Sequence, residues 1–208
     1  MKKITFAALA VIAVALLAFA PGENEKYTTL AIGDKAPMTD AKMKSIDGKE
    51  YSLKSLKASN GTVVIFSCNT CPFVLQWEDR YPQIEEMAIE NQIGFALVNS
   101  NEAKRSGEDS MAEMKKHASE KGYDKVPYLV DENSALANAF GAKTTPHVFL
   151  FDKDWKLVYE GAIDDNGKDA SAVKVSYLLN AFSKLAKGEK IDPSNTKAIG
   201  CSIKRVKI

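Results

Sequence analysis

Cysteine and histidine are scarce in this chain, and neither acidic nor basic residues prevail. The 208 residues include three cysteines and two histidines, and 28 Lys and Arg residues stand against 27 Asp and Glu residues. So few cysteines exclude a small protein stapled by disulfides, and apolar packing must therefore supply most of the stability. A net charge of +1 excludes a general electrostatic attraction to nucleic acid, and we expect no nucleic-acid partner.

Long apolar runs are absent after residue 20, which excludes a polytopic membrane protein. One such run, over residues 4–20, follows two lysines and ends in Ala-Phe-Ala, which is the layout of a secretory signal peptide. We therefore expect an extracytoplasmic protein, either periplasmic or secreted. Pro21 stands where the peptidase would cut and is expected to hinder it. An uncleaved membrane anchor through residues 4–20 is the alternative.

Strand and helix patterns alternate through the rest of the chain. Asp47-Gly48 predicts the turn of an N-terminal β-hairpin, and the apolar run at residues 62–67 predicts a central strand that is buried on both faces. We expect further strands over residues 93–101, 126–132 and 143–163, the last divided by a turn, and helices over residues 73–91, 109–122, 135–141 and 171–188. Pro82 must kink or divide the first of these helices.

This order of elements predicts an α/β fold, with a mixed central sheet and helices on both of its faces. The composition, 45% hydrophobic and 26% charged, is that of an ordinary folded protein. We expect the folded domain over residues 27–187. A lysine-rich tail follows at residues 188–208, and its sequence predicts no regular structure.

Cys68 and Cys71 form a CxxC pair where the central strand gives way to a helix. We expect Cys68 to lie near the helix N-terminus, where unpaired N–H groups and the positive end of the dipole favour a thiolate. Cys71, one turn later, can reach the same sulfur, which predicts a reversible disulfide. A permanent bridge would close only a tiny loop and add little stability. A closed zinc site would have only Cys201, His117 and His147 as further ligands.

Two other features leave alternatives open. Pro146 stands at the head of a predicted strand, where a trans-proline is the simplest interpretation and a cis bond is the special case. Cys201 is the odd thiol: it is either buried and inert, or it packs near the CxxC pair and exchanges disulfides with it. His147 is interpreted as a packing or solvent-facing residue rather than a ligand.

These motifs together resemble the thioredoxin-like redoxins, which include thioredoxin, the TlpA-like and ResA-like exported reductases, and the peroxiredoxins. The stretch IFSCNTCP resembles their active-site strand and CxxC pair, and TTPHVFLFD resembles their cis-proline strand. The stretches ALVNSN, PYLVDE, GAIDDN and GCSIK are similar to signatures of a peroxiredoxin-like group that carries CxxC. The resemblance covers about residues 32–186.

The resemblance implies a thioredoxin-like fold and a role for four residues. Cys68 is then the nucleophile and Cys71 the resolving thiol, while Thr145 and Pro146 form the loop that holds the substrate backbone. No cofactor and no resident metal are needed.

The chain also departs from the family patterns. Peroxiredoxins carry TxxC with proline after the peroxide-attacking cysteine; here Cys71 takes that place, but Cys68 replaces the threonine. The usual arginine near GxIDD is absent, since Ala162 stands there. Thr62 and Val74 occupy the positions of the acids that thioredoxins and ResA-like proteins use. General acid or base duty is therefore unassigned, and the candidates are Glu78, Asp79, Asp164 and Asp165.

We therefore predict an exported thiol:disulfide oxidoreductase. Its partners would be protein or small-molecule thiols and disulfides, together with a redox partner that recycles the CxxC pair. A second hypothesis is a copper metallochaperone similar to the Sco proteins, with Cys68, Cys71 and His147 as ligands, although those proteins carry CxxxCP rather than CxxCP. A third is a thiol peroxidase that depends on Cys71 more than on Cys68.

Overall fold

The computed structural model describes residues 27–206 of the chain. The signal peptide or anchor expected at residues 1–20 lies outside this range. Within residues 27–206, no helix is long and apolar enough to cross a membrane.

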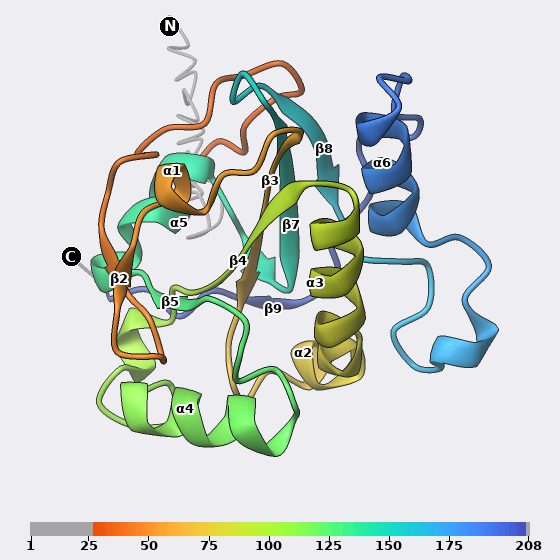
Figure 1. The fold of residues 1–208 in the computed structure, drawn as a ribbon. Helices are drawn as coiled ribbons and strands as arrows, with labels where there is room; N and C mark the ends of the chain where they lie inside the picture. Colours follow the sequence, from red (N-terminus) through yellow and green to blue (C-terminus); the bar gives the residue numbers. More distant parts are fainter. Residues whose placement is uncertain (1–26, 207–208) are drawn as a thin grey trace, which may run out of the picture.

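A five-stranded mixed sheet occupies the centre of the molecule, in the order β5-β4-β3-β7-β8 (Figure 1). The strands are β3 (Gly61–Ser67), β4 (Ile93–Asn99), β5 (Tyr128–Val130), β7 (His147–Asp152) and β8 (Leu157–Gly161). β4 runs parallel to β3 and β5, whereas β7 runs antiparallel to β3 and β8. Every residue of β3 is buried, as its unbroken apolar run predicts.

Helices cover both faces of this sheet (Figure 1). They are α1 (Leu53–Leu56), α2 (Pro72–Trp77), α3 (Tyr81–Glu90), α4 (Met111–Glu120), α5 (Ala135–Phe140) and α6 (Tyr177–Ala186). Successive side chains of β3 point to opposite faces, so Val63 and Ile65 pack in one core with residues of α3, α4 and α6. Val64 and Phe66 pack in the other core with residues of α1 and α5. The predicted α/β architecture is confirmed.

The N-terminal hairpin is also confirmed. Its strands, β1 (Met43–Lys44) and β2 (Glu50–Tyr51), pair antiparallel around Gly48, whose φ of 84° lies in the left-handed region that favours glycine. The pairing is only two residues long on each side. The hairpin forms a separate two-stranded sheet, which an isolated antiparallel bridge between Ser45 and Leu129 connects to β5.

One predicted helix is divided, as its proline predicts, and another is shorter than predicted. The helix expected over residues 73–91 is divided into α2 and α3 by a 3₁₀ turn at Glu78–Arg80, and Pro82 stands in the first turn of α3, where its missing N–H costs little. The helix expected over 171–188 begins only at Tyr177, after a short 3₁₀ turn at Ala170–Ala172. The segment between this 3₁₀ turn and α6 is not helical, and in it the N–H of Lys174 donates a hydrogen bond to Asp165 at 3.0 Å.

The lysine-rich tail has more structure than its sequence predicts. Its strand β9 (Cys201–Ser202) pairs antiparallel with β6 (Thr144–Thr145), the two-residue strand that precedes Pro146. The tail therefore returns to the edge of the domain at which the CxxC pair lies.

We predict that Phe140→Ala lowers the free energy of unfolding by about 3–5 kcal/mol, because it opens a cavity in the core against α5. Phe140 is fully buried and meets the rings of Phe66, Phe149 and Phe151 edge to face, with centroids 5.3–5.5 Å away. Urea denaturation measures this change. The control is Ile89→Ala on α3, where the side chain is 68% exposed and a change within about 0.5 kcal/mol is expected. Equal losses in the two variants would contradict this packing.

Candidate active site

The sheet topology brings two distant segments together at one edge. β7 runs antiparallel to β3, and the register pairs Phe66 with His147. The C-terminal end of β3 therefore lies beside the N-terminal end of β7. Cys68 follows β3 and Thr145 precedes β7. The Sγ of Cys68 consequently lies 3.3 Å from the hydroxyl Oγ1 of Thr145. The peptide bond between Thr145 and Pro146 is cis, which is the special case that the sequence left open.

The helix after the CxxC pair begins at Pro72, one residue before the predicted start at residue 73. Cys71, not Cys68, is the N-cap residue of α2, and Pro72 occupies the first helical position. Cys68 lies three residues before this N-cap, near the start of the helix but outside its first turn. The physical reason is Pro72, whose fixed φ suits the first helical position and whose missing N–H is not needed there.

The two thiols of the pair differ sharply in acidity. A hydrogen bond from Cys68 is the largest influence on the pKa of Cys71 and, against the opposing effect of burial, lowers it to about 4. The Cys201 thiol and the N–H groups of Val74 and Cys201 act in the same direction. The Sγ of Cys71 also donates to the carbonyl of Thr145 at 3.2 Å.

Cys68 shows the opposite shift. The bond to the Cys71 sulfur and burial both raise the pKa of Cys68, and the Thr145 hydroxyl only partly offsets them. The directions of the two shifts favour Cys71 as the ionised thiol of the reduced pair, whereas the sequence favours Cys68, and the role of each thiol stays a prediction.

A cavity of about 220 Å³ opens beside the pair. The CxxC segment, the Asn101–Glu108 loop, Thr145 and the tail line it together. Cys68 is only 2% exposed and Cys71 5% exposed, so a reactant must reach them through this cavity. Lys104 and Lys204 place two cationic side chains in its lining.

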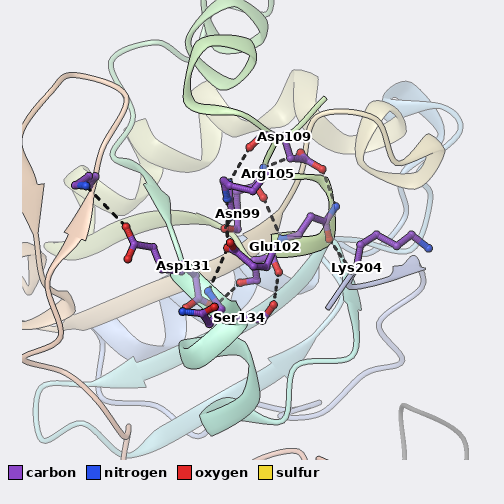
Figure 2. A network of polar contacts seen from close by, with 12 residues as sticks. Asn99, Glu102, Arg105, Asp109, Asp131, Ser134 and Lys204 are labelled. Atoms are coloured by element: carbon purple, nitrogen blue, oxygen red, sulfur yellow. Dashed lines mark hydrogen bonds and ion pairs between the residues drawn. The ribbon is translucent and has the colours of Figure 1, made fainter. Parts of the chain in front are cut away.

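A buried carboxylate that sequence reasoning missed holds the CxxC loop in place. Asp109 is fully buried and accepts hydrogen bonds from the backbone N–H of Asn69 at 2.9 Å, from Asn99 Nδ2 at 2.7 Å and from Asn101 Nδ2 at 3.0 Å. Figure 2 shows Asp109 beside Asn99 and Arg105. The available signal was Asn99 at the end of β4, because parallel strands β3 and β4 end at the same edge of the sheet.

His147 does not join the cysteines. It is buried on β7, where its Nδ1 accepts the N–H of Lys143 at 3.2 Å and its Nε2 pairs with the carboxylate of Glu160. Among the residues that the structure describes, no group of three or more His, Cys, Asp or Glu side chains is placed to hold a metal ion. The copper hypothesis therefore loses its third ligand.

The candidate acids have structural partners away from the sulfurs. Burial alone would raise the pKa of Glu78, but hydrogen bonds from His117 and Lys121 hold it below its usual value. Asp164 accepts a bond from Trp77 Nε1 at 2.8 Å and pairs with Arg80. Asp79 pairs with Arg80, and Asp165 accepts a hydrogen bond from the N–H of Lys174. None of these contacts reaches a cysteine.

The sequence model of the Redoxin family matches residues 31–175. The chain belongs to the redoxin family. Among solved structures, an uncharacterized conserved protein from Geobacillus kaustophilus is 33% identical with a TM-score of 0.78, and the match covers 86% of this chain and 94% of that one. The resemblance to redoxins and the expected fold class are thereby confirmed.

Two further structures place this redoxin among thioredoxin-like folds. The hypothetical protein SMc02350 from Sinorhizobium meliloti 1021 is 27% identical, with a TM-score of 0.77 over 86% of this chain and 97% of that one. The thioredoxin domain of thiol-disulfide oxidoreductase BVU-2223 from Bacteroides vulgatus shares the fold at 17% identity, with a TM-score of 0.53 over 64% and 90% of the two chains. No curated protein matches the chain.

We predict that alkylation of Cys71 in the reduced redoxin changes little between about pH 6 and pH 8, because its thiolate is already formed. An ordinary thiol loses about tenfold of its thiolate per pH unit in this range. Site-resolved mass spectrometry after iodoacetamide pulses measures both rates in one sample. Cys201 is the internal control, since burial and the neighbouring Cys71 raise its pKa, and its labelling should fall steeply as the pH falls. A steep fall at Cys71 would contradict the assignment.

We also predict that Asp109→Asn lowers the free energy of unfolding by about 1–3 kcal/mol, because an amide leaves buried N–H donors without an acceptor. Asp79→Asn is the matched control, since the Asp79 side chain is 67% exposed. Urea denaturation of the two variants gives the comparison. An unchanged midpoint for Asp109→Asn would show that this carboxylate does not hold the loop.

Proposed function

We propose that this redoxin is a thiol:disulfide oxidoreductase in which the Cys71 thiolate is the nucleophile and Cys68 is the resolving thiol. The observation that carries the proposal is the position of Cys71 at the start of α2, next to a protonated Cys68 that lowers its pKa. This reverses the two roles that the resemblance implied. Cys68 and Cys71 are still the two cysteines that form the redox-active disulfide.

The same geometry supports a complete reaction cycle. The Cys71 thiolate attacks a substrate disulfide and forms a mixed disulfide, and one substrate sulfur leaves as a thiolate. The ionised Cys71, the main cause of the raised pKa of Cys68, is then gone. Cys68 can now lose its proton and attack the Cys71 sulfur. The second substrate thiolate leaves, and the two substrate thiolates take up the proton lost by Cys68 and one proton from solvent. The two electrons that Cys68 and Cys71 lose on forming their disulfide are gained by the substrate.

We further propose that Thr145 and Pro146 hold the substrate chain over the pair. Thr145 already touches both sulfurs, through its hydroxyl to Cys68 and its carbonyl to Cys71. The partners are protein or small-molecule thiols and disulfides, and an external dithiol must recycle the couple. Export through residues 4–20 is part of the proposal, because a compartment poor in glutathione suits a disulfide exchanger.

Thiol peroxidase activity is the second candidate. One observation favours it: the cysteine with the lowered pKa, Cys71, precedes proline, as the peroxide-attacking cysteine of peroxiredoxins does, and Cys68 takes the place of their threonine. A peroxide would need only the cavity beside the pair, whereas a protein disulfide needs the edge at Thr145.

The test is catalysed reduction of a model peptide disulfide, with dithiothreitol as the reductant. We expect Cys71→Ser to lower the rate to that of the uncatalysed exchange, since it removes the attacking thiolate. When dithiothreitol is removed before the peptide is added, Cys68→Ser/Cys201→Ser should accumulate the peptide on Cys71, because no protein or free thiol remains to resolve it. Mass spectrometry identifies the trapped peptide.

Hydrogen peroxide consumption, measured with the same variants, separates the two functions. Peroxide turnover without peptide-disulfide exchange would replace the first proposal by the second. Trapping of the peptide on Cys68 in Cys71→Ser, at the wild-type rate, would overturn the assignment of the nucleophile.

A further inference from the structure

The tail is fixed against the active site on both sides of Cys201. Strand β9 pairs with β6, and the register sets Cys201 opposite Thr145. Ile203 is 5% exposed, and its N–H donates to the carbonyl of Lys143 at 3.1 Å. The N–H of Lys204 donates to Asn101 Oδ1 at 2.8 Å, and Figure 2 shows Lys204 beside the Asn99–Asp109 network. These contacts hold the tail in one register along the edge of β6.

Gly200 explains how closely this strand approaches. A Cβ at Gly200 would lie 2.3 Å from the carbonyl oxygen of Thr145, so only glycine fits there. That same carbonyl lies 3.2 Å from the Sγ of Cys71. This close approach places the next residue, Cys201, beside the sulfur of Cys71.

The three cysteines form one cluster. Cys201 packs against the small core of Cys68, Cys71 and Val74, and it lines the same cavity as the other two. All three carry free thiols in this structure. Cys201 is half-buried, whereas Cys68 and Cys71 are almost completely enclosed. The mutual influence of Cys71 and Cys201 on their pKa values agrees with this proximity.

We propose that Cys201 is a third redox-active thiol, which exchanges with the oxidised couple to form a Cys71–Cys201 disulfide. The Cys201 thiolate attacks the Cys71 sulfur, the Cys68–Cys71 bond breaks, and Cys68 leaves as a thiolate that takes up a proton. The number of disulfides is unchanged, so the step needs no oxidant. It moves the disulfide from an enclosed pair to a sulfur that an external thiol can reach. The inference rests on the redox activity of Cys71 proposed above.

The test uses Cys68→Ser, which removes the competing partner but keeps Cys71 and Cys201. The purified variant is oxidised with diamide, its remaining thiols are blocked with N-ethylmaleimide, and the monomer is digested for peptide mapping. We expect a linked peptide pair that contains Cys71 and Cys201. A monomer in which both thiols remain blocked, or oxidation only to intermolecular dimers, would overturn the proposal.

The matched control moves the thiol by one residue along β9. In Cys68→Ser/Cys201→Ser/Ser202→Cys the new thiol belongs to the opposite face of the strand, and we expect the linked peptide to be lost. Equal linkage in this variant would overturn the role of the β9 register. Cys201→Ser, which retains the original couple, tests the proposed function separately. If it fails to form the Cys68–Cys71 disulfide, the proposed function fails, whatever Cys201 does.

Discussion

The antiparallel pairing of β3 with β7 is the constraint on which the whole site depends. It sets the end of one buried strand beside the beginning of another and so joins Cys68 to Thr145, although 77 positions separate them in the chain. Both strands are central in the sheet and packed on both faces, so the geometry is fixed by the core. The sulfur chemistry is therefore placed at the ends of two buried central strands, and the helix α2 leads away from it.

Around this junction, polar groups tie three further segments to the same edge. Asp109 accepts hydrogen bonds from the CxxC loop and from Asn99 at the end of β4, and so joins the two. Asn101 accepts the N–H of Lys204 and so joins the same network to the tail. The side chains are buried, where each hydrogen bond is stronger than in water and each missing partner is costly. As a result, the position of Cys201 depends on the same network that positions the Cys68–Cys71 pair.

The sequence predicted the strands and the hairpin because these follow from local apolar patterns and turn residues, whereas the pairing of the CxxC and cis-proline motifs was implied by the resemblance to redoxins. It failed where a single residue shifts a boundary by a few positions. Pro72 makes Cys71, and not Cys68, the N-cap residue of α2. The contribution of Asp109 and the return of the tail at Gly200 depend on contacts across the fold, which no local pattern contains. The arrangement of Cys201 was one of two open alternatives, and only the pairing of β9 with β6 decides where its thiol lies.

The central claim is that one sulfur of the couple, Cys71, is ionised in the reduced protein at neutral pH while Cys68 keeps its proton. The reduction potential of the couple, measured against glutathione between about pH 6 and pH 8, tests this directly, and the Cys201→Ser variant keeps the couple isolated. With one thiolate already formed, reduction takes up one proton per two electrons, and the potential should change by about 30 mV per pH unit. A slope of about 59 mV per pH unit, which two protonated thiols would give, would contradict the account.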